Sequence, residues 1–212
     1  MKIIRHIHAC VEVLVDETRI IIDPGEFGIP DSLDQADAIL ITHHHFDHVD
    51  QERIKKLVEK KPHIKVFGPS SFADDVDFPV TIAKEGDDFS VGDARISVHG
   101  QFQDIANLAD DPIENVGYLI NDFLLHPGDA LPKIEDSPAV LLPMAAPWVK
   151  TRDIQTYLRN YKPRFILPNH DLILNDMGRE FSLKTFEQLA KEIDATVYGL
   201  QPGQSIEFEL NQ

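Results

Sequence analysis

The sequence predicts an α+β protein in which two sheets pack face to face and helices cover the outside. Two observations predict this fold. Short strand-like segments fill most of the chain, and a few amphipathic helices interrupt them in each half. Candidate metal ligands follow strands in both halves, so we expect the strand ends of the two sheets to meet at one site. The length suits a single domain spanning residues 1–212.

Closely spaced strands dominate the first half. Alternating or continuous apolar patterns predict strands at 2–7, 10–15, 19–23, 38–42, 64–67, 79–82, 88–91 and 95–99. One helix is expected between them. Asp50 can cap its start, an apolar stripe includes Ile54 and Val58, and Pro62 should end it.

The second half repeats this mixture. Strands are predicted at 116–120, 123–125, 139–142, 165–167, 196–200 and 205–210. Asn121 and Asp122 should form a two-residue hairpin turn between the first two of these strands. We expect one helix to begin with Thr151 as its cap and to end at Pro163, and a last helix to begin near Ser182.

The composition limits the function classes. The net charge is −16, so the polyanionic backbone of a nucleic acid would be repelled, and a small-molecule substrate is expected instead. No apolar run is long enough for a signal peptide or a membrane span, which predicts a cytoplasmic location and no membrane partner. The one cysteine, Cys10, can form no internal disulfide. Assembly into a homo-oligomer remains open.

The most informative segment is Thr42-His43-His44-His45-Phe46-Asp47-His48, which follows a buried strand. Imidazole and carboxylate groups are ligands that suit zinc and its first-row neighbours. His43 and His45 are two residues apart in an extended segment, so their side chains leave the same face. Asp47 and His48 are adjacent and point in different directions. The segment can therefore serve two neighbouring metal positions, and His44 is expected not to be a ligand.

Further ligands must come from elsewhere, because catalytic zinc usually takes three protein ligands. Asp129 lies in His126-Pro127-Gly128-Asp129-Ala130, just after a strand, where a carboxylate can bridge two cations. His170 follows the strand at 165–167 and is a natural last ligand.

At this point the chain resembles the metallo-β-lactamase superfamily, and most closely its branch of metal-dependent hydrolases related to ascorbate-6-phosphate lactonases. The matching segments follow the family's order: IDPG (22–25), THHHFDH (42–48), NVGYLI (115–120), HPGDA (126–130) and PNHD (168–171). The resemblance implies a four-layer αββα sandwich with one or two metal ions at one edge. It assigns His43 and His45 to the first metal, and Asp47, His48 and His170 to the second. Asp129 bridges the two.

One segment departs from the family's pattern. The family supplies another histidine to the first metal from the region that here reads Val98-His99-Gly100-Gln101-Phe102-Gln103-Asp104. By its spacing after the glycine, Gln103 occupies the expected position. Either His99 takes the role, or the first site is weakened and Gln103 or Asp104 lines it.

Four other residues are candidates for places beside the ligands. His8 matches a histidine often found in the related hydrolases and is expected near the site. Asp23 should fix a loop under the metals. His126 is either a partner of a ligand or a structural histidine, and Trp148 either walls the substrate pocket or packs in the core.

These features predict a metal-dependent hydrolase with one or two divalent transition-metal ions, zinc first and manganese or iron as alternatives. Metal-activated water would attack a small-molecule ester, lactone or phosphoester, and Asp47 would orient the water or receive its proton. A phosphorylated substrate would call for basic residues near the metals, with Lys150, Arg152 and Arg179 as candidates. The competing hypotheses are a metal-binding protein whose first site has degraded and which lacks hydrolytic activity, and an iron-loaded oxidoreductase.

Overall fold

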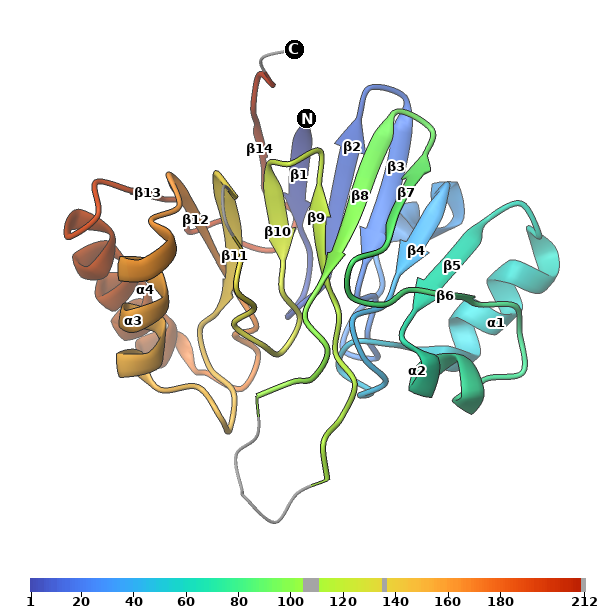
Figure 1. Cartoon of the computed structure of the whole chain (residues 1–212), viewed down its shortest axis with the longest axis horizontal. Helices are drawn as coiled ribbons and strands as arrows, with labels where there is room; N and C mark the ends of the chain where they lie inside the picture. Colours follow the sequence, from blue (N-terminus) through green and yellow to red (C-terminus); the bar gives the residue numbers. More distant parts are fainter. Residues whose placement is uncertain (105–110, 135–136, 211–212) are drawn as a thin grey trace.

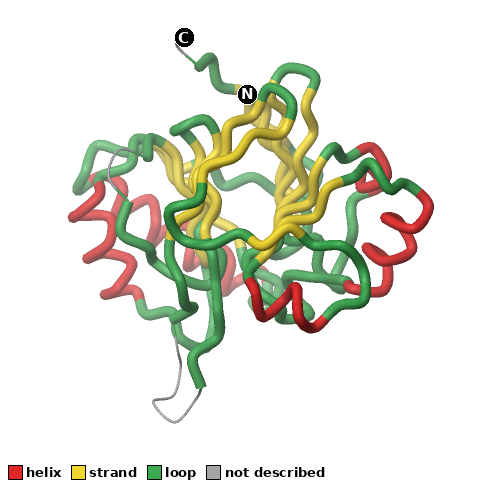
Figure 2. Tube along the Cα trace, turned by 45° about the vertical axis from the view of Figure 1, so that its right-hand side comes forward, coloured by secondary structure: helices red, strands yellow, loops and turns green. Residues whose placement is uncertain are grey.

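The computed structural model describes residues 1–104, 111–134 and 137–210. Two mixed seven-stranded sheets lie face to face, and helices cover the outer face of each sheet (Figures 1 and 2). The predicted α+β fold with four αββα layers is thus confirmed.

The first sheet has the strand order β14-β1-β2-β3-β4-β5-β6. Its strands are β1 (Lys2–Arg5), β2 (Val11–Val15), β3 (Thr18–Ile22), β4 (Ala38–Leu40), β5 (Lys65–Gly68), β6 (Thr81–Ile82) and β14 (Ser205–Glu207). The chain forms an antiparallel meander through β3 and then turns parallel, since β4, β5 and β6 each pair in parallel with the preceding strand. The carboxyl ends of β3 and β4 therefore share one edge.

The second sheet has the order β13-β12-β11-β10-β9-β8-β7. Its strands are β7 (Asp88–Val91), β8 (Ala94–His99), β9 (Gly117–Ile120), β10 (Leu124–His126), β11 (Ala139–Pro143), β12 (Phe165–Asn169) and β13 (Thr196–Val197). Neighbouring strands pair antiparallel from β7 through β8 and β9 to β10, and they pair parallel from β10 through β11 and β12 to β13. The ends of β10 and β12 therefore lie at the same edge.

Three apolar clusters hold the layers together. Ile20, Leu40 and Leu124 belong to the largest cluster, which fills the space between the sheets. On the outside of the first sheet, α1 (Gln51–Lys60) and α2 (Ser70–Asp75) bury Ile54 and Phe72. On the outside of the second, α3 (Thr151–Tyr161) and α4 (Asp176–Lys191) pack against the strands. Burial of these faces is the main favourable term in folding.

The helix starts test the local sequence signals. Asp50 accepts a hydrogen bond from Arg53 N and caps α1, as predicted. Two other predictions were wrong. Thr151 is the first residue of α3 and its side chain makes no cap bond, because Lys150 occupies the cap position. The last helix begins at Asp176, where Asn175 caps it by accepting from Gly178 N, and not near Ser182.

Every predicted strand is present, although several are shorter at one end. Asn121 and Asp122 have φ angles of 51° and 50°, which confirms the two-residue turn between β9 and β10. The sequence analysis missed α2 and the 3-10 helix η1 (Asp31–Gln35). Among the residues that the structure describes, no helix is long and apolar enough to cross a membrane.

Candidate metal centre

The candidate ligands lie on loops that leave β4, β10 and β12 at the edge where the two sheets meet. They form two groups of side chains whose ligand atoms lie within 4.8 Å of one another. One group is His43, His45 and Asp129, and the other is His8, Asp47, His48 and His170. The two halves of the chain each supply ligands to the same site, as the sequence predicts.

Each buried ligand histidine is anchored through Nδ1, which leaves its other ring nitrogen available. His48 Nδ1 lies 2.7 Å from Asp23 Oδ2, and His170 Nδ1 lies 2.7 Å from the carbonyl oxygen of Ala145. His43 Nδ1 lies 3.0 Å from Thr42 Oγ1. Such a partner fixes the proton on Nδ1 and leaves Nε2 to face the site, where Nε2 of His43 lies 3.0 Å from His45 Nδ1.

Asp23 organises the loop after β4, as predicted. It is fully buried, and its Oδ1 accepts from Thr42 N at 2.8 Å. Its Oδ2 accepts from Thr42 Oγ1 at 2.7 Å as well as from His48. Since its oxygens are used in this way, Asp23 positions ligands and does not belong to either ligand group.

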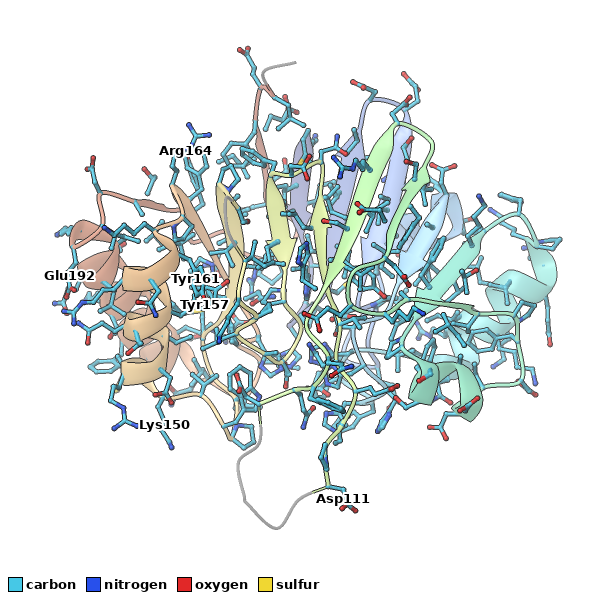
Figure 3. The ribbon with its side chains drawn as sticks, in the orientation of Figure 1. Asp111, Lys150, Tyr157, Tyr161, Arg164 and Glu192 are labelled. Carbon is cyan, nitrogen blue, oxygen red and sulfur yellow. The ribbon has the colours of Figure 1, made fainter. Side chains whose placement is uncertain are left out.

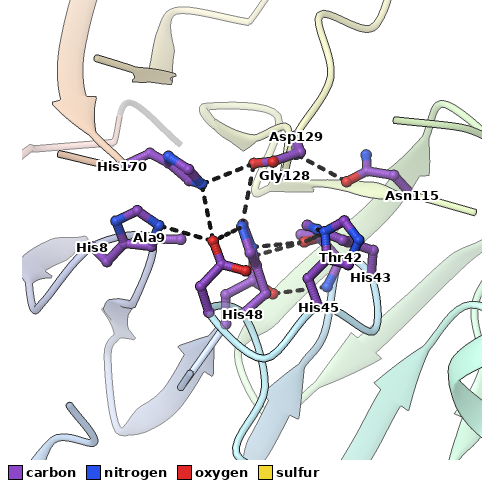
Figure 4. A network of polar contacts seen from close by, with 12 residues as sticks. His8, Ala9, Thr42, His43, His45, His48, Asn115, Gly128, Asp129 and His170 are labelled. Carbon is purple, nitrogen blue, oxygen red and sulfur yellow. Dashed lines mark hydrogen bonds and ion pairs between the residues drawn. The ribbon is translucent and has the colours of Figure 1, made fainter. Parts of the chain in front are cut away.

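Asp129 joins the two groups. Its Oδ1 lies 3.2 Å from His48 Nε2 and 3.3 Å from His170 Nε2 (Figure 4). Its backbone N–H donates to Asn115 Oδ1 at 2.9 Å, and Trp148 Nε1 donates to its Oδ2 at 3.2 Å. The carboxylate is therefore held from two sides in a position that suits a bridge between two ions.

Asp47 is held by His8. His8 Nε2 lies 3.1 Å from Asp47 Oδ2, while His8 Nδ1 accepts from Leu172 N at 3.3 Å. A neutral imidazole that accepts at Nδ1 carries its proton on Nε2. His8 therefore donates to Asp47, and we interpret it as a partner of this ligand despite its place in the second group.

The structure offers a direct test of whether a metal fits. His48 Nε2, His170 Nε2 and Asp129 Oδ1 are buried, and the oxygen lies 3.2 and 3.3 Å from the two nitrogens, but none of the three has a hydrogen bond of good geometry among the described residues. Unpaired buried polar atoms are strongly unfavourable. A shared cation would satisfy all three, and imidazole nitrogens with carboxylate oxygens are the ligands that zinc and related ions prefer. The residues fit a metal centre.

The electrostatics agree with a cation site. Burial alone would raise the pKa of the Asp129 carboxyl, but His48 and His170 outweigh it and hold that pKa well below its usual range. Burial would likewise lower the pKa of His48, but Asp129 and Asp23 raise it well above its usual value. Without a metal, the positive charge that these carboxylates attract is the proton of His48, and a bound cation would take its place.

Three residues at the site have left-handed backbone conformations. The φ angles of His8, Asp23 and His170 are 60°, 51° and 54°. Residues with side chains rarely adopt this region, and such strain is concentrated at functional sites. All three residues also make side-chain contacts within the site, to Asp47, His48 and Ala145 respectively.

The first metal position lacks the expected third histidine. His99 is in neither ligand group, and its Nε2 lies 2.9 Å from Ser97 Oγ. The charged groups that act on its pKa are Asp88, Glu85 and Asp122, all outside the site. Gln103 differs, because its Oε1 is buried and has no hydrogen-bond partner within residues 1–104, 111–134 and 137–210. Its neighbour Asp104 donates its backbone N–H to Asp129 O at 2.9 Å. These contacts favour Gln103 over His99 as the residue that lines the first metal position.

The remaining predicted residues support the site from outside. His126 Nε2 lies 2.8 Å from Ala9 O and its Nδ1 accepts from Gly128 N, so it is a structural histidine under the ligands. Trp148 both contacts Asp129 and lines a cavity of about 220 Å³. His44 belongs to neither ligand group, consistent with the expectation that it is not a ligand.

Sequence analysis missed two supporting contacts. Asn115 fixes the Asp129 loop, and its place in NVGYLI is the only sequence signal for it. Arg5 forms a buried ion pair with Asp171, the residue after His170, and donates to Leu200 O at 3.0 Å. No local pattern could have found this pair, because β1 and β12 belong to different sheets.

Comparison with known families agrees with this geometry. The sequence model of the beta-lactamase superfamily domain matches residues 2–170. The chain belongs to the metallo-β-lactamase superfamily. The match includes the segments that carry every candidate ligand.

Individual proteins resemble this chain in sequence or in fold. Protein Rv0786c of Mycobacterium tuberculosis is 32% identical over 174 residues, which cover 79% of this chain and 82% of that protein. A metallo hydrolase from the archaeon Ignicoccus hospitalis has the same fold, with a TM-score of 0.75 at 19% identity and 99% of each chain covered. CmlA, a diiron beta-hydroxylase from Streptomyces venezuelae, has a TM-score of 0.69 at 14% identity, covering 98% of this chain and 54% of that one.

Proposed function

We propose that the protein is a metal-dependent hydrolase that acts on a small-molecule ester, lactone or phosphoester. The observation that supports this most is the convergence of unpaired, buried ligand atoms from both sheets. The proposed cofactor is one or two divalent transition-metal ions, zinc first and manganese or iron as alternatives. The order of the sequence motifs supports a finer proposal, that the chain belongs to the branch related to ascorbate-6-phosphate lactonases.

The side chains have distinct roles in this proposal. His43, His45 and Asp129 would hold one ion, and Asp47, His48 and His170 with Asp129 would hold the other. When bound, such ions supply Lewis acidity, which makes water a nucleophile near neutral pH and polarises the attacked oxygen. Asp47, held by His8, would orient the attacking water or receive its proton. Its side chain is 19% exposed, so a water molecule can reach it.

The environment suits a small substrate. The net charge of −16 disfavours nucleic acid, and we propose a cytoplasmic location with no membrane partner. The oligomeric state is left open by this proposal.

A second candidate function is metal binding without hydrolysis, through a degraded first site. Gln103 in the place of a histidine favours it, because an amide oxygen is a weaker ligand for zinc than imidazole. Iron chemistry is a further alternative. It is supported only by the shared fold with a diiron protein, and a shared fold alone does not establish an activity.

The test is a hydrolysis screen on zinc-loaded protein with ester, lactone and phosphodiester probes. We expect turnover by the wild type and by His44→Ala, and loss of turnover in Asp129→Ala, because only the last substitution removes a bridging ligand. Zinc-loaded wild type that hydrolyses none of the probes would favour the metal-binding alternative.

A further inference from the structure

The metal centre reaches solvent on one side. The side chains of His48, Asp129 and His170 are 1%, 8% and 6% exposed, whereas that of Asp47 is 19% exposed. His45 is also half-buried. A substrate must therefore approach past the segment that contains these two ligands, and the residue between them is Phe46.

Two aromatic rings stand at this opening. Phe46 is 57% exposed and Phe27 is 40% exposed. Their ring centroids lie 5.5 Å apart, and the Phe27 ring packs edge-on against His8 at 5.3 Å. Because His8 in turn holds Asp47, the aromatic pair lies one contact away from a metal ligand.

The segment after His170 adds two more exposed apolar side chains. Leu172 is 40% exposed and Ile173 is 63% exposed. Leu172 N donates to His8 Nδ1, which ties this segment to the same histidine that Phe27 contacts. We call Phe27, Phe46, Leu172 and Ile173 the apolar rim: Phe27 and Phe46 are in ring contact, and the 172–173 segment is joined to them through its backbone bond to His8. A group of large, exposed apolar side chains beside a site is typical of a binding surface.

Basic residues are missing from the contacts of the site. Among the described residues, the ion pairs of Asp47 and Asp129 are all with histidines and none is with a lysine or arginine. The undescribed ranges contain no lysine or arginine either. Arg5 and Arg179 are already paired with Asp171, so neither is an unengaged cation for a substrate phosphate or carboxylate away from the scissile bond.

The basic residues suggested by the sequence are engaged or lie elsewhere. Arg179 pairs with Asp171 and Asp176, and Arg152 pairs with Asp153. Lys150 extends outward from the start of α3 (Figure 3). It lines the cavity beside Trp148 together with two carboxylates, Asp104 and Asp153, so that this cavity has no excess of positive charge.

We propose that the substrate is an uncharged ester or lactone whose apolar acyl part packs on the apolar rim, and that phosphorylated substrates are rejected. This inference depends on the metal centre proposed above, and it narrows the substrate class. Burial of each additional methylene group against the rim should improve binding about twofold to fourfold.

The test uses alkyl hydroxamates of increasing chain length as metal-directed probes on zinc-loaded protein, with affinity measured by calorimetry. The wild type should bind more tightly with each added methylene group. Phe46→Ala and Ile173→Ala should flatten this dependence while zinc content stays at the wild-type value. Both side chains are more than half exposed, so neither change should disturb folding.

The matched control is Ile82→Ala, which removes a side chain that is 52% exposed on β6, the outermost strand of the first sheet. It should leave the dependence on chain length unchanged. A flat dependence in the wild type, or equal slopes in the wild type and both rim variants, would overturn the proposal. So would tighter binding of a hydroxamate that ends in a phosphate.

These outcomes are separable from failure of the proposed hydrolysis, because hydroxamate binding needs metal and no turnover. A rising affinity without hydrolysis of any alkyl ester would preserve the rim and reject the enzyme. Hydrolysis of esters with no preference for chain length would support the proposed enzyme and reject the apolar rim as its binding surface.

Discussion

His43, His48 and His170 each use Nδ1 to bind a supporting group and turn Nε2 toward the other candidate ligands, His45 or Asp129. The partners that hold Nδ1 are Thr42, Asp23 and the carbonyl of residue 145, a different type of group in each case. Such partners fix the ring orientation and typically change metal affinity 10- to 100-fold when they are lost. The geometry of the site thus depends on residues that never touch the ion.

Gln103 gives a residue-level prediction. If its amide oxygen lines the first metal position, Gln103→His should tighten zinc binding at the weaker of two sites by about tenfold or more, since imidazole is the better zinc ligand. Calorimetric titration of metal-free protein with zinc measures both affinities. His99→Ala is the control and should change neither value, because His99 bonds Ser97. Weaker zinc binding in His99→Ala would show that His99, and not Gln103, contributes to the first metal position.

The convergence of the candidate ligands could be predicted from the sequence, because the dense local motif indicates metal-binding chemistry. His43, His45, Asp47 and His48 lie within one segment, and the structure brings them together as expected. The contacts that support the candidate ligands could not be predicted from the sequence. Arg5 and Asp171 are separated by 166 residues and meet only because the two sheets pack together.

At the level of elements, the loop after β10 shows why one glycine is required. Gly128 has a φ of +64°, and a Cβ there would lie 2.2 Å from Asn115 Oδ1 and 2.7 Å from Thr42 Cβ. Asn115 holds Asp129 and Thr42 supports His43, so the glycine lies between two supports of the metal centre.

Gly128→Ala should therefore destabilise the protein by more than about 2 kcal/mol and also reduce its zinc content. The reduction follows because relief of the clash must move Asn115 or Thr42. Chemical denaturation and elemental analysis measure the two effects. Gly86→Ala is a matched control, with a φ of +87° and no atom within 4 Å of an added Cβ. It should cost about 1–2 kcal/mol and leave zinc content unchanged. Equal effects of the two substitutions would reject this explanation.

Element boundaries were less predictable than element types. The first turn of α4 contains Asp176, Gly178 and Arg179. These residues give little apolar periodicity, so the sequence pattern predicts a later start for the helix. Its start is set by the Asn175 cap instead. The predicted start of α3 was wrong although a cap signal was present. Thr151 is a good cap residue by type, but the chain enters the helix one position earlier.

At the scale of the whole molecule, the site lies between two sheets that are joined by apolar packing and by polar contacts such as the Arg5–Asp171 ion pair. His43, His45, Asp47 and His48 come from the first sheet, and Asp129 and His170 come from the second. The strand orders could not be derived from the sequence, because pairing between distant segments such as β1 and β14 leaves no local signal. The motifs still predicted that both halves would contribute ligands.

Since ions bound between the sheets stabilise the native state but not the unfolded chain, zinc should raise the melting temperature of the metal-free protein. The rise should grow with zinc concentration, and thermal unfolding followed by circular dichroism measures it. Asp129→Ala should show a smaller rise, because the variant loses the carboxylate that is proposed to bridge the ions. A melting temperature independent of zinc would mean that no site couples the sheets.

Metal content per chain tests the central claim most directly. Elemental mass spectrometry on protein without a histidine tag, after reloading with zinc and removal of the excess, should give up to two equivalents for the wild type and for His44→Ala. Asp129→Ala should retain fewer. A wild type that binds no zinc, manganese or iron, or an Asp129→Ala variant that retains the wild-type amount, would contradict a metal centre bridged by Asp129.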